Sequence, residues 1–243
     1  MIEGEKLGSF WGYTFAGVWQ EDDVNAPFVD ANGQTNGKTN GEVYKVKPGN
    51  SKYVDVNKDG VYNDADQGII GCGQPTFNWG WNNTFNYKNF DFSFFVVGFH
   101  GFDIYNATHQ MGYNLIKSQQ MAGVTPMREL LNRWTPTNTN TDIPGFVKGG
   151  TENKVFFSTR FVVFGIFIKM KSITLGYTLP EATCRSLGIN NLRVYASVQN
   201  PFHITKYSGL DPEATMGSPL VQGVDWGAYP NSRNYLIGLN FSF

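Results

Sequence analysis

The chain has no long hydrophobic run, little charge and almost no cysteine. No segment of its 243 residues approaches the roughly 18 consecutive apolar residues that a membrane-spanning helix needs. Only 16% of the residues are charged and the formal net charge is −1, which removes the electrostatic case for binding nucleic acid. The two cysteines, Cys72 and Cys184, lack the spacing of a metal or redox site.

Glycine and aromatic residues are abundant instead. The chain contains 28 Gly, 20 Phe, 12 Tyr and 6 Trp, and its mean hydropathy is −0.31. A transmembrane β-barrel fits these values, because only alternate strand residues meet lipid and aromatic girdles flank the apolar band. A soluble carbohydrate-binding β-sandwich fits them as well, so composition leaves both classes open.

The C-terminal segment shows the most regular alternation. One side of an extended strand would carry Tyr235, Ile237, Leu239, Phe241 and Phe243, and the other side Leu236, Gly238, Asn240 and Ser242. About ten residues suffice for a tilted strand to cross a bilayer. The segment is therefore predicted to be the closing strand of an outer-membrane barrel.

The same alternation predicts six antiparallel strands in all. They cover Gly8–Val18, Thr76–Tyr87, Phe90–Phe99, Ile166–Thr178, Leu192–Asn200 and Tyr235–Phe243. Lys88-Asn89 joins the second strand to the third as a tight hairpin, in which Asn89 is expected to take the positive φ.

Two lysines interrupt the fourth predicted strand. Lys169 and Lys171 share parity with Ile173, Leu175 and Tyr177, so they fall on its apolar side. Either the lysines lie near the membrane interface, where a charge costs about 0–1 kcal/mol, or a β-bulge shifts the register. The position near the interface is the preferred interpretation.

The connections between the strands alternate in length. Long ones cover about 19–75, 100–165 and 201–233, and short ones are Lys88-Asn89 and about Leu179–Asn191. Outer-membrane barrels have short periplasmic turns and long extracellular loops. Six strands cannot close a barrel, and no apolar signal-peptide core follows Met1. We therefore expect a fragment of a longer protein, or else an assembly of several copies.

The segment from Asp55 to Asp66 matches a twelve-position calcium-binding loop. The candidate ligands are the side chains of Asp55, Asn57, Asp59, Asn63 and Asp66 and the carbonyl group of Val61. Gly60 stands where the loop must turn sharply. Asp66 replaces the usual glutamate at position 12, so weak binding suited to millimolar calcium is expected; a metal-free polar loop is the alternative.

Four aromatic residues in the long connections could contact a substrate or a capping protein. They are Trp134, Tyr207, Trp226 and Tyr229. Packing of the loops against one another is the alternative role. No nucleophile elbow, phosphate loop or zinc signature is present, so no enzymatic activity is predicted.

Several segments, in order along nearly the whole chain, resemble the C-terminal part of the SusC/RagA family of TonB-linked outer-membrane proteins of Bacteroidetes. They are Gly8–Tyr13, Asp55–Gly71, Asn82–Phe94, Leu131–Pro136, Lys171–Pro180, Leu192–Asn200, Tyr207–Glu213 and the terminal strand.

The resemblance implies an all-β fold: about six C-terminal strands of a 22-stranded antiparallel transmembrane barrel with long extracellular loops. Residues 1–243 would be the C-terminal portion, without the plug domain and the N-terminal strands. The implied function is import of glycan or peptide oligomers across the outer membrane. The implied partners are the rest of the barrel and its plug, a SusD-like lipoprotein, the TonB–ExbB–ExbD complex and lipid. The alternative is a soluble, calcium-stabilised carbohydrate-binding β-sandwich.

Overall fold

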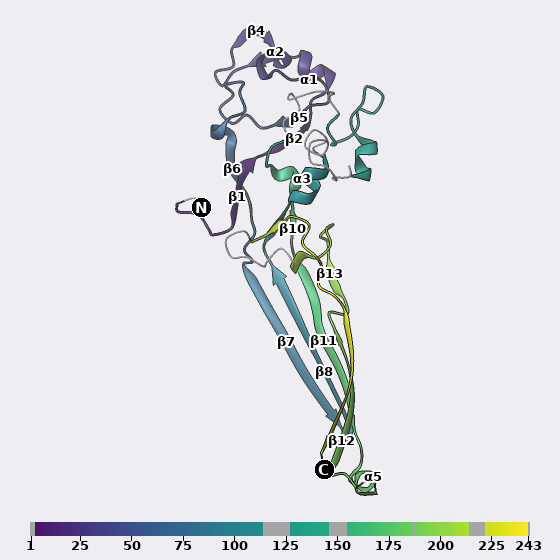
Figure 1. The fold of residues 1–243 in the computed structure, drawn as a ribbon. Helices are drawn as coiled ribbons and strands as arrows, with labels where there is room; N and C mark the ends of the chain where they lie inside the picture. Colours follow the sequence, from purple (N-terminus) through teal and green to yellow (C-terminus); the bar gives the residue numbers. More distant parts are fainter. Residues whose placement is uncertain (1–2, 114–126, 146–154, 187, 214–221, 243) are drawn as a thin grey trace. The chain divides into compact units, whose positions relative to one another are not determined.

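The computed structural model describes residues 3–113, 127–145, 155–186, 188–213 and 222–242 (Figure 1). The chain forms two compact units. The first comprises Met1–Gly73, Tyr105–Val163 and Val224–Gly227, and the second Gln74–Ile104, Phe164–Gly223 and Ala228–Phe243. Across the described ranges, no helix has the length and apolar character needed to cross a membrane.

The second unit is built on one antiparallel sheet with the strand order β15-β12-β11-β8-β7. These strands are β7 (Phe77–Tyr87), β8 (Phe90–His100), β11 (Phe167–Thr178), β12 (Asn191–Gln199) and β15 (Asn234–Ser242). A sixth strand, β13 (His203–Thr205), pairs with the first residues of β11. The short helix α5 (Glu181–Ser186) lies in the connection from β11 to β12. Five of the six predicted strands are thus present in the sheet.

The strand register gives this sheet one apolar and one polar face. One apolar row across the five long strands consists of Phe85, Phe92, Leu175, Ala196 and Ile237. The neighbouring row consists of Thr84, Ser93, Thr174, Ser197 and Leu236 and faces the other way. On β15 the apolar face is open, with Tyr235 75%, Ile237 82%, Leu239 60% and Phe241 58% exposed. Phe243, predicted to end this face, lies outside the described residues.

A β-bulge at Lys171 corrects the preferred interpretation of the two lysines. The register of β11 against β8 shifts between Met170 and Ser172, so Lys171 is an extra residue. Because of this shift, Met170 shares the apolar face with Ile173, and Lys169 turns to the polar face. The bulge, the alternative not preferred, accounts for the parity of the lysines.

The hairpin at 88–89 also differs from its prediction. Lys88, and not Asn89, takes the positive φ, at 52°. Asn89 instead joins the hairpin to β11: its side-chain amide donates to the carbonyl of Thr178 at 2.7 Å, and its own carbonyl accepts from the Thr178 N–H at 2.8 Å.

The first predicted strand, Gly8–Val18, is not part of the large sheet. It forms β1 (Ser9–Tyr13) and β2 (Phe15–Val18) of the first unit, which pair with β6 (Gln67–Cys72) and β5 (Ser51–Tyr53). Both pairings contain a register shift. Within this segment Phe10 and Tyr13 are 5% and 6% exposed. These aromatic side chains are therefore buried in a protein core and do not face lipid.

Short elements make up the remainder of the first unit. They are α1 (Glu21–Asn25), β3 (Pro27–Val29), β4 (Thr35–Thr39), α2 (Asn40–Tyr44), η1 (Asp64–Asp66), α3 (Ala107–Tyr113), η2 (Arg128–Asn132), η3 (Thr159–Phe161) and β14 (Val224–Asp225). The chain passes between the units within β9 (Asp103–Asn106) and β10 (Val162–Phe164).

An aromatic core holds the first unit together. It contains Phe10, Tyr105, Ala107 and Phe161, and the ring of Tyr105 stacks on Phe157 with 3.7 Å between ring centroids. These residues come from segments up to about 150 positions apart in the sequence. Long-range aromatic packing, rather than a continuous sheet, therefore defines this unit.

Candidate functional site

The predicted calcium loop connects β5 to β6 in the first unit and ends in the 3₁₀ helix η1. Gly60, the sixth residue of the loop, has φ of +82°, a conformation that side chains with a Cβ rarely adopt. A Cβ at this position would also collide with Val43. The loop thus makes the sharp turn that the motif requires at this residue.

Asp55, the first predicted ligand, has one engaged and one free carboxylate oxygen. Its Oδ2 accepts hydrogen bonds from the Tyr44 hydroxyl and the Gly60 N–H, both at 2.8 Å. Its Oδ1 is buried and has no hydrogen-bond partner within the described part of the chain. Burial and the Asp55 carboxylate raise the pKa of Tyr44, so the hydroxyl stays a donor. A buried carboxylate oxygen without a partner is costly unless a cation or water binds it.

The middle of the loop brings four predicted ligands together. Asp59 Oδ2 accepts from the side-chain amides of Asn57 at 2.9 Å and Asn63 at 3.1 Å. The Val61 N–H donates to Asp59 Oδ1, and this bond together with the amides lowers the pKa of Asp59. The Val61 carbonyl accepts from the Asn63 amide at 3.2 Å. A bound cation would compete with these amide groups for the same oxygens.

Asp66, the last predicted ligand, closes the loop. It is 3% exposed, and its two carboxylate oxygens accept from the Val56 N–H at 2.8 Å and the Asn63 N–H at 3.0 Å. Among the residues with a described position, no three His, Cys, Asp or Glu side chains are grouped closely enough to hold a metal ion by themselves. Any cation here would also need amide and carbonyl oxygens, as the motif predicts.

The four predicted contact aromatics fall into two classes. Trp134 is half-buried, packs against Gly49 and Gly145, and donates its indole N–H to Gln20 at 3.0 Å. Tyr207 is only 6% exposed. Trp226 and Tyr229 are 67% and 88% exposed. A role in ligand contact stays a prediction for all four. Trp226 and Tyr229 are the better candidates because their side chains are exposed.

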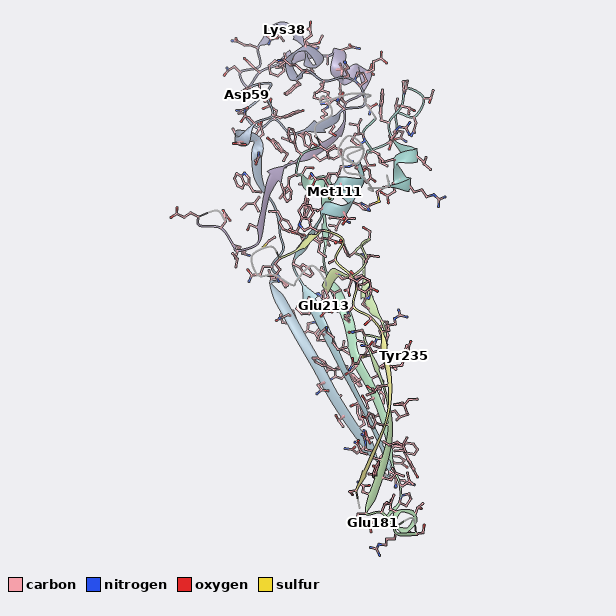
Figure 2. The ribbon with its side chains drawn as sticks, viewed as in Figure 1. Lys38, Asp59, Met111, Glu181, Glu213 and Tyr235 are labelled. Carbon is pink, nitrogen blue, oxygen red and sulfur yellow. The ribbon has the colours of Figure 1, made fainter. Side chains whose placement is uncertain are left out.

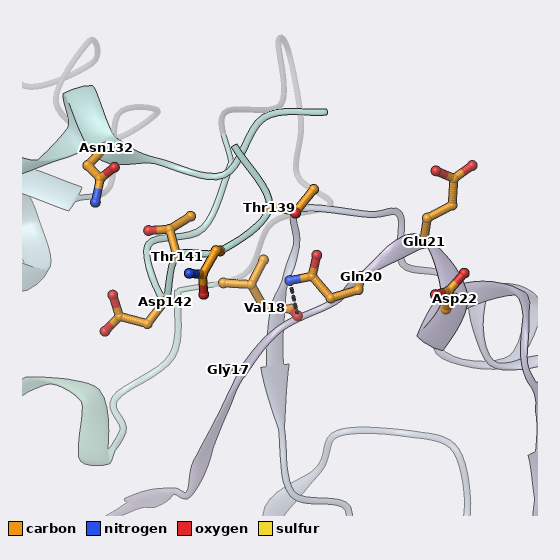
Figure 3. A pocket seen from close by; sticks show the side chains of 10 residues that line it. Gly17, Val18, Gln20, Glu21, Asp22, Asn132, Thr139, Thr141 and Asp142 are labelled. Atoms are coloured by element: carbon orange, nitrogen blue, oxygen red, sulfur yellow. Dashed lines mark hydrogen bonds between the residues drawn. The ribbon is translucent and has the colours of Figure 1, made fainter. Parts of the chain in front are cut away.

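A polar cleft of about 920 Å³ opens in the first unit (Figure 3). Residues at the start of α1, including Glu21 and Asp22, line it together with the segment from Thr139 to Asp142. Gln20 is held in place by a hydrogen bond from its amide to the Val18 carbonyl at 3.2 Å. Of the described residues that line the cleft, none is a lysine or an arginine. This lining disfavours anionic ligands and provides acceptors for neutral or cationic ones.

A buried ion-pair cluster lies on the polar face of the second unit. Lys169 Nζ contacts Asp211 Oδ2 at 3.0 Å and Glu213 Oε2 at 2.7 Å, and Lys171 also binds Glu213. Lys169 and Asp211 are 2% and 4% exposed. Figure 2 shows Glu213 beside one end of the long strands, with Glu181 of α5 at the opposite end.

A second ion pair spans three strands of the same face. The Arg193 guanidinium of β12 binds the Asp91 carboxylate of β8 through two hydrogen bonds, at 2.8 and 2.5 Å. Gly176 of β11 lies between them, and a Cβ there would collide with both side chains. As predicted from parity, Arg193 is directed away from the apolar face.

Comparisons with known proteins identify the family. TonB-dependent receptor P3 of Formosa agariphila is 34% identical over 247 residues, which cover 99% of this chain and 22% of that protein. TonB-dependent receptor SusC of Bacteroides thetaiotaomicron is 30% identical, covering 81% of this chain and 18% of that protein. The chain belongs to the SusC/RagA-like TonB-dependent receptors. No family model matches this receptor chain.

The solved structures agree with the fold of this receptor chain. The RagAB peptide transporter superposes with a TM-score of 0.68 at 22% identity, over 97% of this chain and 22% of that one. The receptor chain spans about a fifth of the length of the curated relatives it matches. Membership of this family confirms the predicted non-enzymatic receptor class and the predicted outer-membrane location.

The ion-pair cluster of this receptor was not predicted from the sequence. Asp211 and Glu213 follow Lys169 by about 40 residues. A signal was present: two lysines at apolar parity in a strand imply either an interface or nearby carboxylates. The position of the bulge decides between these two explanations. It depends on how β11 pairs with β8, so the sequence of β11 alone does not reveal it.

Proposed function

We propose that this receptor segment contributes adjacent barrel strands and extracellular loops to an outer-membrane importer of oligomeric nutrients, glycans or peptides. The observation that carries the proposal is the antiparallel sheet, whose five long strands present one exposed apolar face and one polar face. Its long strands have 9 to 12 residues, close to the roughly 9–11 that cross a bilayer when tilted. The apolar face would meet lipid, and the polar face the barrel interior.

The sheet topology supports this orientation. The hairpin at 88–89 and the turn between β11 and β12 join one end of the strands, and every long connection joins the other end. Long connections would then be extracellular, and the short turns periplasmic. The soluble sandwich lacks support, because no second sheet covers the apolar face in the described part of the second unit.

The two edges of the sheet, at β7 and β15, indicate that further strands are needed to complete a barrel. Among the described strands, nothing pairs with the outer edge of β7 or with that of β15. Unpaired backbone groups are not tolerated in lipid, so further strands would flank both edges. We propose that this C-terminal segment joins the rest of the barrel and its plug, a SusD-like lipoprotein at the extracellular loops, and the TonB–ExbB–ExbD complex through the plug.

Uptake in the native host tests the proposed function. The gene for the full-length receptor would be deleted, and uptake of labelled oligosaccharides and labelled oligopeptides measured separately. We expect deletion to abolish uptake of one ligand class, and the full-length gene to restore it. Unchanged uptake of both classes would contradict the import proposal, and the class that is lost identifies the substrate type.

We also propose that the loop Asp55–Asp66 binds calcium at extracellular concentrations. The buried, unpartnered Oδ1 of Asp55 supports this, as does the gathering of Asn57, Asp59 and Asn63 side chains in the middle of the loop. Sites of extracellular modules bind with a Kd of about 10⁻⁴–10⁻³ M. At ten times the Kd, calcium would stabilise the loop by about 1.4 kcal/mol.

Terbium luminescence in the purified full-length receptor tests the calcium site. Tyr44 contacts Asp55 directly, so its ring should sensitise a bound lanthanide. We expect a signal that millimolar calcium displaces and that Asp55→Asn removes. The matched control is Asp30→Asn, in another loop of the same unit, which should leave the signal unchanged. A signal that survives Asp55→Asn, or no signal in the parent protein, would refute calcium binding here.

A further inference from the structure

Lys169 joins three separate segments of the second unit. It lies on β11 two residues before the bulge, and its ammonium group binds the carboxylates of Asp211 and Glu213. These carboxylates also accept from Asn231: its backbone N–H donates to Asp211 Oδ2 at 3.1 Å, and its side-chain amide to Glu213 Oε2 at 2.9 Å. The cluster therefore connects β11 to two points of the chain that both lie within the connection between β13 and β15.

The contacts hold both ends of one loop at the same place. Glu213 precedes this loop and Asn231 follows it, and the two residues are hydrogen-bonded to each other. Asp211 Oδ1 accepts from the Glu213 N–H at 3.0 Å, which fixes the backbone at the first end. The two ends of the loop, which together form the loop base, are thus bonded to each other, and Lys169 attaches them to β11.

Because the cluster is buried, its stability depends on each of its charged members. Two lysines and two carboxylates give a neutral group, so each charge is compensated. Removing one member of a buried ion pair leaves an uncompensated charge, which is strongly destabilising. Lys171 is more exposed, with 30% of its side chain accessible, and pairs with Glu213 alone among the carboxylates whose positions are described, so its removal should have a smaller effect.

We propose that Lys169 is a positioning residue that fastens both ends of the loop between Glu213 and Asn231 to the polar face of β11. Its significance for import rests on the proposed function, in which this loop base stands at the extracellular end of the barrel. The lysine would then fix where the loop begins and ends while ligand is taken up.

Hydrogen exchange of the intact, full-length receptor, followed by mass spectrometry, tests the proposal. In Lys169→Met we expect the amides of Glu213 and Asn231 to exchange at least about tenfold faster, because their carboxylate acceptors are released. Lys171→Met should give a smaller increase, and Lys169→Arg should restore most of the protection. If Lys169→Met does not assemble, the milder variants Glu213→Gln and Asn231→Ala should each still accelerate exchange at the loop base.

The matched control is Arg193→Met, which breaks an ion pair on the same face of the sheet. It should leave exchange at Glu213 and Asn231 unchanged. Equal exchange in Lys169→Met and the parent, or the same increase in Arg193→Met, would overturn the proposal. Exchange is measured without transport, so loss of the import function and loss of the loop attachment are separate results.

Discussion

The two units of this chain use the same residue types in opposite ways. In the second unit, large apolar side chains such as Ile237 and Tyr87 are 82% and 71% exposed on one face of a sheet. In the first unit, Phe161 and Tyr105 are 3% and 1% exposed in an aromatic core. The apolar residues of the aromatic core are thus buried by protein, whereas those on the open face of the sheet lie on a surface that lipid would cover.

The largest expected difference comes from truncating one apolar side chain in each unit. Phe161→Ala should destabilise the first unit by about 3–5 kcal/mol, because it leaves a cavity in a packed core. Ile237→Ala should cost less than about 1 kcal/mol, since lipid would fill the space that it leaves. Native-state hydrogen exchange of the full-length receptor in bilayer nanodiscs measures both local effects.

If Phe161→Ala and Ile237→Ala destabilised their units equally, the two apolar environments would not differ as described. A large effect of Ile237→Ala would mean that protein, rather than lipid, packs against the apolar face. A small effect of Phe161→Ala would mean that the aromatic core does not hold the first unit together.

Acid should have a smaller effect, which separates the ends of the loop at Glu213 and Asn231 from the strands of the sheet. Burial opposes the ionisation of Asp211 and Glu213, yet hydrogen bonds from Lys169 and from neighbouring donors hold the pKa of both carboxyls below their usual range. Their ionised forms are thus stabilised by folding. This contribution is complete above the ordinary carboxyl pKa of about 4 and is lost as the pH falls through the lowered values.

Hydrogen exchange corrected for intrinsic rates should therefore show the amides of Glu213 and Asn231 losing protection below about pH 4. Amides in the β12–β15 ladder should keep their protection, because strand hydrogen bonds do not titrate. Acid protection at the loop base equal to that at neutral pH would show that these carboxylates do not hold it.

Much of the sheet could be predicted from sequence because its pattern is local. Apolar and polar side chains alternate with every residue of a strand that has two different environments, so the faces of Phe85 and Thr84 can be predicted without knowing the partner strand. The hairpin at 88–89 and the calcium-type loop are also local, since turn residues and ligand spacing lie within a few positions.

The remainder depends on contacts between distant segments. Gly8–Val18 alternates as a membrane strand does, yet Phe10 packs with Tyr105, about 95 positions away. The bulge at Lys171 exists only in relation to the register of β8, so parity alone placed Lys169 on the wrong face. The carboxylates that bind this lysine follow it by about 40 residues, beyond the reach of any strand pattern.

The central claim is that the apolar face of the sheet meets lipid and the polar face does not. Two adjacent residues of β15 test it most directly, because Ile237 and Leu236 are similar in size and face opposite sides, at 82% and 51% exposure. Each would be replaced by arginine in the full-length receptor, and the folded fraction in outer membranes measured by heat-modifiable gel mobility. Ile237→Arg should lower this fraction sharply, since arginine on a lipid face costs about 2–4 kcal/mol near the midplane, and Leu236→Arg should assemble normally. Normal assembly of Ile237→Arg would contradict the account.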